Sequence, residues 1–342
     1  KFLNIRPSKI NNFVQISSDL IDPPSEIKST FLNPKTINKN ALQFSESFLN
    51  KNISNSGIYE GIVKPSKRPA EKLQVKNNLL GFFIGFLLNI KNYYFSKSFR
   101  DNHCPNPLLI ALYKYLLNPL RAFYTNIIFA KIYVRPSDLI DKDYAFFPMH
   151  TEPEVSLLVY SRPIINQIEI IRCIALSLPI GMKLVVKEHP WMIGKRKISA
   201  YKKLLNIPNV LISSPEVSTN KWIRNSNLVT IISSSVGQEA VFLGKPVLTF
   251  GNCMINMLPQ TLVKKADALI NLPDDIRNLI KNYTFNKEII VNYIASIISN
   301  TYPLNLYSSL LTRKSAFKYK KSDFNEDLEK FVQSILDKLD QI

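Results

Sequence analysis

A regular alternation of predicted strands and helices in the second part of the chain constrains its fold more than any other feature. From Tyr144 onward, short apolar runs end at turn-forming residues and are followed by segments with helical spacing. The predicted strands are Tyr144–Pro148, Lys183–Lys187, Asn209–Ser213, Leu228–Ile232 and Val247–Phe250. The predicted helices cover about residues 164–178, 196–206, 218–225, 236–243, 272–281, 286–299 and 323–340. This pattern predicts an α/β fold with a doubly wound parallel sheet.

The first part of the chain lacks this alternation. Residues 1–75 are rich in Asn, Ser, Lys and Pro and are expected to be irregular with a few short helices, whereas residues 76–130 have helical spacing. A chain of 342 residues favours two domains. We therefore expect a largely helical or irregular region over 1–143, a Rossmann-like domain over 144–300, and a helical segment over 301–342 that packs back on the body.

Positive charge is concentrated in the first part. The chain has 44 Lys and Arg against 26 Asp and Glu, a formal charge of +18, and residues 1–135 hold 19 of the former and 7 of the latter. Such an excess favours a polyanionic partner (nucleic acid, anionic lipid or phosphorylated substrates) or reflects Lys on a solvated surface. No nucleic-acid-binding motif is present and the aromatic residues have core-like spacing, so nucleic acid is not expected.

One apolar run, Leu79–Leu88, raises the question of a membrane segment. Ten residues span only about 15 Å as a helix, half of a hydrocarbon core of about 30 Å. Basic and aromatic residues follow the run, which would suit a helix lying on a membrane surface, but a buried core helix is the preferred interpretation. The chain begins with Lys1 and shows no secretory signal there. We expect a cytoplasmic protein, with peripheral attachment to the cytoplasmic face of the inner membrane as a further option.

The cysteines and histidines predict neither a zinc site nor a disulfide framework. Cys104, Cys173 and Cys253 are far apart, no CxxC pair occurs, and the three histidines are scattered. We therefore expect no metal and a reducing compartment.

Polar, turn-forming residues follow three of the predicted strands, at the sheet edge where open parallel sheets bind ligands. These segments are Lys187-Glu188-His189-Pro190, Ser233-Ser234-Ser235-Val236-Gly237 and Phe250-Gly251-Asn252. The serine hydroxyls and the backbone N–H groups of the following helix could hold a phosphate, and Gly237 would let a ligand approach the backbone. Glu239, in the first helical turn, could reach a ribose. Simple capping of the helix by Ser235 is the alternative.

Two histidine-containing loops could carry chemistry. His189 follows a strand directly, and it could donate to a phosphate or protonate a leaving group, with Lys187 and Arg196 as further positive charge. His150 lies in a second loop with Glu152 and Glu154, a set that suits a general base or a nucleophile. A structural loop histidine and a solvated acidic loop are the respective alternatives.

Taken in order, these motifs resemble the capsule-polysaccharide synthesis family, which includes bacterial transferases of 3-deoxy-manno-octulosonic acid (Kdo) with a GT-B-like architecture. The resemblance covers about residues 144–260. It is carried by Phe147-Pro148-Met149-His150-Thr151-Glu152-Pro153-Glu154, Val186-Lys187-Glu188-His189-Pro190, Pro208-Asn209-Val210, Ser233-Ser234-Ser235-Val236-Gly237-Gln238-Glu239-Ala240 and Gly244-Lys245-Pro246-Val247-Leu248-Thr249-Phe250-Gly251.

The resemblance implies a glycosyltransferase of bacterial capsule or lipopolysaccharide synthesis, which moves Kdo or a related acidic sugar from a CMP-activated donor to a glycan or glycolipid acceptor. It implies that His189 and Ser233 to Ser235 hold the CMP phosphate, that Glu239 contacts the ribose and that Pro190 shapes the base pocket. Glu154 would be a catalytic or acceptor-orienting carboxylate. Lys187, Gly237 and Gly251 complete the expected donor site, and His150 is a further catalytic candidate. No cofactor is expected beyond the donor itself.

The sequence departs from the family at two places and leaves other functions open. The family loop often reads Gln-Pro-Glu, whereas this chain has Glu152-Pro153-Glu154, and residues 1–143 lack the βαβ pattern of a GT-B amino-terminal domain, which is either truncated or divergent. One alternative is a UDP-sugar-dependent transferase or 2-epimerase-like enzyme of the same architecture. A basic nucleic-acid-binding protein and a non-catalytic polysaccharide-assembly or polyanion-binding protein are alternatives of other classes.

Overall fold

The centre of the molecule is a six-stranded, fully parallel β-sheet. The computed structural model describes residues 3–10, 12–54, 79–95, 106–162, 166–311 and 323–340. The strands are β3 (Tyr144–Pro148), β4 (Lys183–Lys187), β5 (Val210–Ile212), β6 (Leu228–Ile231), β7 (Val247–Thr249) and β8 (Val263–Lys265). Their order across the sheet is β5-β4-β3-β6-β7-β8, and every neighbouring pair is parallel. Counted from β3, this is the 3-2-1-4-5-6 order of the Rossmann fold.

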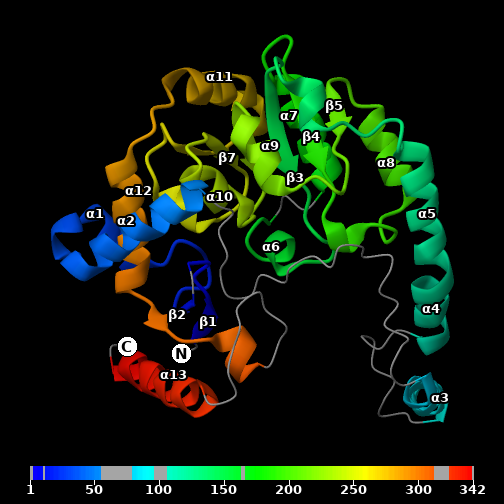
Figure 1. The fold of residues 1–342 in the computed structure, drawn as a ribbon, viewed down its shortest axis with the longest axis horizontal. Helices are drawn as coiled ribbons and strands as arrows, with labels where there is room; N and C mark the ends of the chain where they lie inside the picture. The colour runs from blue at the N-terminus through cyan, green and yellow to red at the C-terminus, as the bar shows by residue number, and fades with distance from the viewer. Residues whose placement is uncertain are drawn as a thin grey trace.

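Helices cover both faces of the sheet, so the doubly wound α/β fold is confirmed (Figure 1). One face packs against α7 (Gln167–Ser177), α8 (Ile198–Leu205) and α11 (Leu272–Asn282). The other packs against α9 (Thr219–Asn225), α10 (Val236–Phe242) and α12 (Lys287–Ser299). Because side chains alternate along a strand, Phe147 joins the first core and its neighbour Phe146 joins the second. Both cores are buried, which fixes the sheet as a rigid platform for the loops at its edge.

The sequence predicts the elements of this part of the chain to within a few residues. Each predicted strand and helix from residue 144 onward is present in the structure. The sequence analysis missed some short elements. One is β8, which is three residues long and contains two lysines; others are α6 (Val155–Leu158) and β9 (Tyr302–Pro303).

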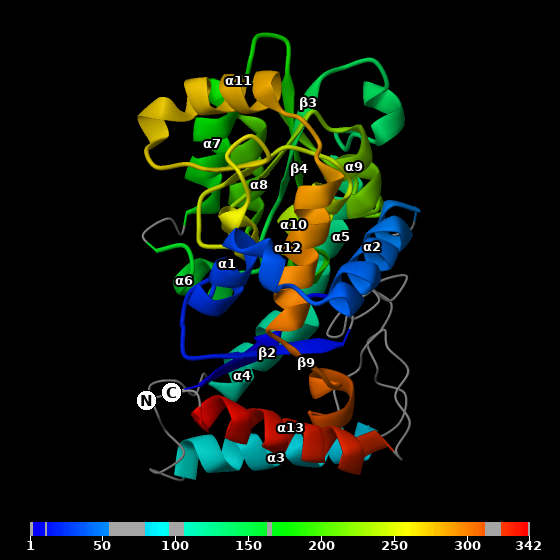
Figure 2. The same ribbon diagram turned by 90° about the vertical axis from the view of Figure 1, so that its left-hand side faces the viewer.

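The amino-terminal residues build a second layer around α12. A hairpin of β1 (Asn4–Pro7) and β2 (Phe13–Ser17) forms a small antiparallel sheet with β9 (Tyr302–Pro303). The helices α1 (Ser25–Leu32) and α2 (Lys39–Ser54) follow, separated by the short helix η1 (Pro34–Thr36), and lie beside α12 in Figure 2. Ile10, Ile27 and Leu49 are fully buried in the same core as α12. The expectation of irregular structure is therefore wrong for the hairpin, whose strands are too short to show an alternating pattern.

The carboxy-terminal helix α13 (Asp323–Asp340) lies on the small sheet. Phe331 and Ile335 pack against Val14 and Ile16, and Lys338 pairs with Glu26 of α1. The division into parts at residues 143 and 300 stays a prediction.

A column of helices stands at the edge of the body (Figure 1). It contains α3 (Leu79–Phe95), α4 (Pro107–Leu112), the π-helical turn η3 (Tyr113–Leu117) and α5 (Asn118–Phe129). In α3, Ile84, Leu87 and Leu88 are each about half exposed, so the interpretation of this segment as a buried core helix is wrong. None of the helices in the described ranges is both long and apolar enough to cross a bilayer.

The remaining elements are short and connect those above. They are η4 (Pro136–Leu139), α6 (Val155–Leu158), η5 (Pro190–Met192), η6 (Met254–Met257), η7 (Leu269–Asn271) and η8 (Leu306–Leu310).

Candidate functional site

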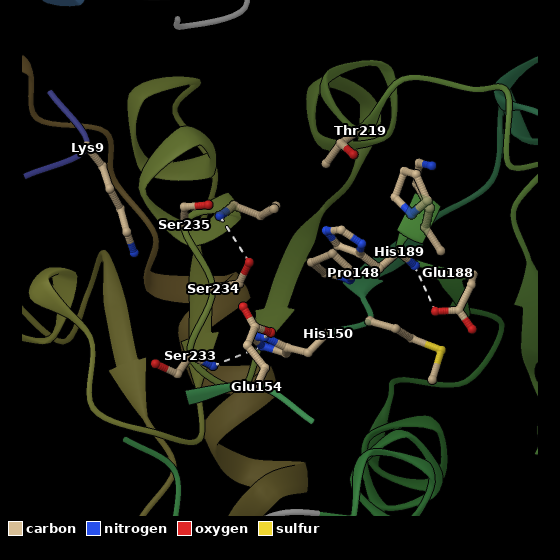
Figure 3. Close-up of a pocket in the computed structure, with 14 residues that line it drawn as sticks. Lys9, Pro148, His150, Glu154, Glu188, His189, Thr219, Ser233, Ser234 and Ser235 are labelled. Carbon is tan, nitrogen blue, oxygen red and sulfur yellow. Dashed lines mark hydrogen bonds and ion pairs between the residues drawn. The ribbon is translucent and has the colours of Figure 1, made fainter. Parts of the chain in front are cut away.

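A pocket opens at the carboxyl ends of the central strands, where the strand order reverses between β3 and β6 (Figure 3). This crevice is where doubly wound sheets bind ligands, because the chain leaves neighbouring strands toward opposite faces. The cavity measures about 330 Å³ and has a mixed polar and apolar lining. Its walls are formed by Lys9, Pro148, Met149, His150, Glu154, Lys187, Glu188, His189, Pro190, Thr219, Ser233, Ser234, Ser235 and Val236. The two histidine loops and the serine run, far apart in sequence, therefore meet around one cavity.

His150 is a buried part of the pocket wall, and both of its ring nitrogens are occupied. Its Nδ1 lies 3.0 Å from Glu154 Oε2, and its Nε2 accepts from the backbone N–H of Ser233 at 3.3 Å. Since Nε2 is an acceptor, the proton of the neutral ring is on Nδ1 and points at the carboxylate. The backbone N–H of His150 donates to Gln167 Oε1 at 2.7 Å. His150 thus joins the carboxylate to the serine run and has no ring nitrogen left for a substrate.

Glu154 presents a carboxylate to the cavity. Its side chain is 37% exposed. Burial raises the pKa of this carboxyl, but hydrogen bonds from His150 and Thr151 and the nearby imidazoles outweigh burial and bring the pKa below its usual value. Glu154 is consequently ionised at neutral pH, and His150 holds it in place.

His189 has the opposite arrangement, with one ring nitrogen left for a ligand. Its Nδ1 accepts from the backbone N–H of Trp191 at 3.2 Å, so the proton of the neutral ring is on Nε2. Burial lowers the pKa of His189, and the charge of Glu154 only partly offsets this. At neutral pH the ring is therefore a neutral hydrogen-bond donor, and it lies between Pro148 and Thr219 at the pocket (Figure 3).

A buried ionic network supports both histidine loops from behind. Glu188 accepts from Arg196 Nε at 2.5 Å, from the hydroxyl of Tyr201 at 3.0 Å and from the backbone N–H of His189 at 2.8 Å. The same guanidinium donates to Glu152 Oε2 at 3.0 Å and to the backbone carbonyl of His150 at 3.1 Å. The expectation that Arg196 adds positive charge to the ligand site is thus wrong, because its charge is matched within this network.

The network also accounts for the unusual residue of the Glu152-Pro153-Glu154 loop. Besides its pair with Arg196, the Glu152 carboxylate accepts from Gln167 Nε2, and the Glu152–Pro153 peptide is cis. Glu152 therefore anchors the loop that carries Glu154.

Lys187, at the end of β4, lines the pocket but is largely enclosed. Its Nζ donates to the carbonyl of Pro215 at 3.3 Å. Burial lowers its pKa to about 8, against an opposing effect of Glu188. Its positive charge is therefore held at neutral pH and lost just above it.

The three serines differ in what they can offer a ligand. Ser233 Oγ donates to the carbonyl of Asn252 at 2.9 Å, which uses its proton. Ser234 Oγ accepts from the N–H of Val236 at 3.2 Å and keeps its proton for a further partner. Ser235 caps α10 without a side-chain bond to it, so capping does not account for its hydroxyl.

Three predicted donor-site residues lie outside the pocket lining. A side chain at Gly237 would meet Ile231 and, at 2.8 Å, Ile255, so glycine here serves the packing of α10 on the sheet. A side chain at Gly251 would meet Ser161 Oγ at 2.5 Å. Glu239 is partly buried, and burial raises its pKa to about 7 in spite of the charge of Lys9. A ribose contact by Glu239 stays a prediction.

Some lining residues had no signal in the sequence. Lys9 reaches the pocket from the β1–β2 turn, and Thr219 reaches it from the start of α9. Only the tertiary arrangement shows that these residues meet.

A comparison with family models identifies the central segment. The model described as "Capsule polysaccharide biosynthesis protein" matches residues 165–279. The resemblance to the capsule-polysaccharide synthesis family is thereby confirmed for this segment. We refer to residues 165–279 as the capsule-synthesis segment. It includes Lys187, His189 and the serine run, whereas His150, Glu154 and Lys9 lie outside it.

Solved structures share parts of this chain's fold at low similarity. KpsC of Thermosulfurimonas dismutans, a beta Kdo 2,7 transferase, aligns over 81% of this chain and 68% of its own, with 14% identity and a TM-score of 0.41. A beta Kdo 2,4 transferase KpsC of the same organism aligns over 60% and 59%, with 15% identity and a TM-score of 0.34. A putative UDP-N-acetylglucosamine 2-epimerase from Listeria monocytogenes aligns over 48% and 42%, with 21% identity and a TM-score of 0.29.

The chain thus spans less than two thirds of the second and third structures, and at TM-scores below 0.5 we transfer no residue role from any of them. No curated protein matches the sequence significantly.

Proposed function

We propose that this protein is a glycosyltransferase of bacterial capsule or lipopolysaccharide synthesis, which transfers Kdo or a related acidic sugar from a CMP-activated donor to a glycan or glycolipid. The observation that carries the proposal is that one cavity at the sheet's switch point is lined by a donor imidazole, a donor serine and an ionised carboxylate. The match of the capsule-synthesis segment supports the pathway. A donor phosphate in this cavity meets His189 and Ser234, which are both hydrogen-bond donors.

In the proposed reaction, an acceptor hydroxyl attacks the anomeric carbon of the sugar while the bond from that carbon to the CMP phosphate oxygen breaks. The electron pair of the broken bond leaves with CMP, and the hydroxyl proton passes to the Glu154 carboxylate. The Nε2–H of His189 and the hydroxyl of Ser234 stabilise the charge that grows on the phosphate. Because His150 donates to Glu154, it positions the base rather than acting as one. No cofactor or metal is part of this proposal.

Two substitutions test the site, with a third as a matched control. His189→Ala and Ser234→Ala each remove one donor to the phosphate, so CMP affinity should fall roughly ten-fold, as expected for a hydrogen bond to a charged group. Ser137→Ala removes an exposed hydroxyl on η4, outside the pocket, and should change nothing. Calorimetric titration with CMP and turnover of a CMP-sugar donor are the measurements. Normal turnover in both site variants would show that the site is assigned wrongly.

The alternative of a UDP-sugar transferase or 2-epimerase-like enzyme uses the same cavity. Thermal-shift measurements with CMP, UDP and their sugars separate the two, because a ligand that binds only the folded state raises the unfolding temperature. Stabilisation by UDP alone would replace the CMP proposal. A filled donor pocket without turnover of any donor would instead favour a non-catalytic assembly protein.

The proposal includes attachment to an anionic membrane surface through the column of helices. Leu109, Leu116 and Phe123 expose 53%, 51% and 67% of their surface, and further apolar residues of α4, η3 and α5 are similarly exposed. The described residues 79–95 and 106–131 contain Lys91, Lys114, Arg121 and Lys131 and no Asp or Glu. Apolar surface combined with positive charge alone suits a bilayer rich in anionic lipid.

Vesicle sedimentation tests this attachment. The intact chain should bind vesicles containing phosphatidylglycerol more tightly than vesicles of phosphatidylcholine. A Leu116→Ser, Phe123→Ser double variant should lose most of this binding, because it removes apolar area from the column. Ile180→Ser changes a fully exposed apolar residue of the turn between α7 and β4 and serves as the control. Unchanged binding by the double variant, or no binding at moderate salt, would refute the attachment.

A further inference from the structure

The tip of the amino-terminal hairpin forms one wall of the pocket. Lys9 lies in the turn between β1 and β2 and lines the cavity together with Ser233, Ser234 and Ser235 (Figure 3). It is 156 residues before the start of the capsule-synthesis segment at residue 165. The family match therefore says nothing about it.

The turn holds Lys9 firmly. On either side of it, Ser8 and Ile10 are buried, and Ile10 belongs to the core shared with α12. The N–H of Ser8 donates to the carbonyl of Phe13 at 2.9 Å, and the N–H of Ile10 donates to Ser8 Oγ at 3.2 Å. Because both neighbours are fixed, the direction in which the Lys9 side chain leaves the turn is fixed as well.

The backbone of Lys9 adopts a conformation that lysine disfavours. Its φ is +64°, in the left-handed region that Gly and Asn occupy at lower cost. Glycine or asparagine at this position would make the fold more stable. The presence of lysine at the pocket wall, despite this cost, therefore indicates a functional role.

The charge of Lys9 is also uncommitted, unlike that of the other basic groups near the cavity. Lys187 donates to a backbone carbonyl and has its pKa lowered to about 8, and Arg196 is matched by Glu152 and Glu188. Within the described part of the chain, no hydrogen bond or ion pair is found for the Lys9 ammonium.

Carboxyl groups near Lys9 do not take up its charge. Asp22 and Glu239 both lie within its electrostatic influence. Asp22, however, is held by Arg6 at 2.6 Å, and burial raises the pKa of Glu239 to about 7. An ammonium that faces a cavity without a partner is suited to an anionic ligand.

We propose that Lys9 binds the phosphate of the nucleotide donor, so that the hairpin and the Rossmann-like sheet together form the donor site. The identity of the phosphate as that of a nucleotide rests on the proposed function, whereas the contact of Lys9 with an anion does not. A charge-assisted contact of this kind corresponds to a change in affinity of roughly ten-fold or more.

The key variant is Lys9→Asn, because it should move binding and stability in opposite directions. Asn tolerates the left-handed backbone, so the variant should unfold at the same temperature as the natural protein or a higher one. Its affinity for CMP and for inorganic pyrophosphate should fall roughly ten-fold or more. Lys9→Arg keeps the charge and should retain most of the affinity. Lys28→Gln removes an exposed charge of α1 outside the pocket and should have no effect.

Calorimetric titration of each intact variant with CMP, UDP and pyrophosphate gives a decisive result. Equal pyrophosphate affinity of the natural protein and Lys9→Asn overturns the proposal, as does a lack of pyrophosphate binding by the natural protein. If pyrophosphate binding depends on Lys9 but neither CMP nor UDP binds, the anion contact stands and the proposed nucleotide function fails. A loss of affinity in Lys28→Gln equal to that in Lys9→Asn would mean that only overall charge matters, which also overturns the proposal.

Discussion

At the residue scale, the two histidines of the pocket have different tasks because their ring nitrogens have different partners. His150 receives a backbone N–H on Nε2 and directs Nδ1 at Glu154, whereas His189 receives a backbone N–H on Nδ1 and keeps Nε2 for a ligand. In this arrangement each ring accepts with one nitrogen and directs the other elsewhere, His150 toward Glu154 and His189 toward the cavity. The sequence identified both residues but could not separate these tasks, since the partners are backbone groups up to 83 residues away.

Other residue-scale features depended on contacts that the sequence does not reveal. The serine run and His189 were predicted from their positions after strands, and the structure brings them to one cavity. Arg196 was misjudged because its carboxylate partners come from two separate loops. Lys9 was missed because it lies in a polar amino-terminal segment, and the sequence does not indicate that this turn reaches the edge of the parallel sheet.

Glu239 yields a prediction about stability and pH. Burial raises the pKa of this carboxyl from 4.5 to about 7 in the folded state, so folding favours its protonated form. Below pH 4.5 this carboxyl is protonated in both states and does not destabilise the fold. Between pH 4.5 and about 7 it ionises in the unfolded chain but not in the folded one, so the free energy of unfolding declines until the pH exceeds about 7. Glu239→Gln should therefore stabilise the protein by on the order of 1–2 kcal/mol at about pH 8 and by almost nothing at about pH 4.5.

Thermal unfolding at the two pH values measures this difference. Equal effects of Glu239→Gln under both conditions would mean that the carboxyl has an ordinary pKa. The substitution keeps the size of the side chain, so packing changes should contribute equally at both pH values.

At the scale of elements, the column of helices packs against the body through α5, and one of these contacts is especially close. A side chain at Gly194 would meet the carbonyl of Asn118 and, at 2.9 Å, the methyl group of Ala122, both in α5. The neighbouring residues of α5 that face the body, Thr125 and Phe129, are buried, while Phe123 and Ile127 are exposed. Periodicity predicted the helices of the column, but it could not tell an exposed apolar helix from a buried one, because apolar residues fill most positions of either kind.

A pair of glycine substitutions tests this attachment. Gly194 and Gly181 have similar backbone angles, with φ of +80° and +88°, but a side chain at Gly181 would meet nothing within 4 Å. Gly181→Ala should thus cost about 1 kcal/mol for the backbone alone, whereas Gly194→Ala should cost a further 1–3 kcal/mol, roughly, for displacing α5. Chemical denaturation measures the free energy of unfolding of both variants. An equal loss in the two would show that α5 moves away from residue 194 at no cost in stability.

At the scale of the whole molecule, the pocket combines segments that are far apart in sequence, from Lys9 of the amino-terminal hairpin to Val236 at the start of α10. The hairpin reaches the cavity because Ile10 is buried beside α12, and the small sheet of the hairpin is in turn covered by α13. The parallel sheet was predictable, since each of its units repeats one local pattern. The way in which residues 3–54 pack around α12 was not, because it depends on pairings between residues some 250 positions apart.

Hydrogen exchange provides a test of this arrangement. CMP should slow amide exchange in the serine loop and also in the β1–β2 turn, because ligand binding lowers the population of locally opened states of both pocket walls. It should leave α4 and α5 unaffected. Anionic vesicles should show the converse pattern, with protection over residues 79–95 and 107–129 of the column and none in the pocket loops. If CMP slows exchange in the serine run but not in the β1–β2 turn, the hairpin is not part of the donor site.

The loop after β4 has a consequence for protein engineering. It holds His189 at the pocket by the bond from Trp191, and five residues later it places Gly194 against α5. With so little chain between the two points, neither can shift without pulling on the other. Chimeras that exchange the peripheral helices for those of another protein must therefore keep the length of this connection, since one inserted residue would shift the His189 ring and the graft junction together.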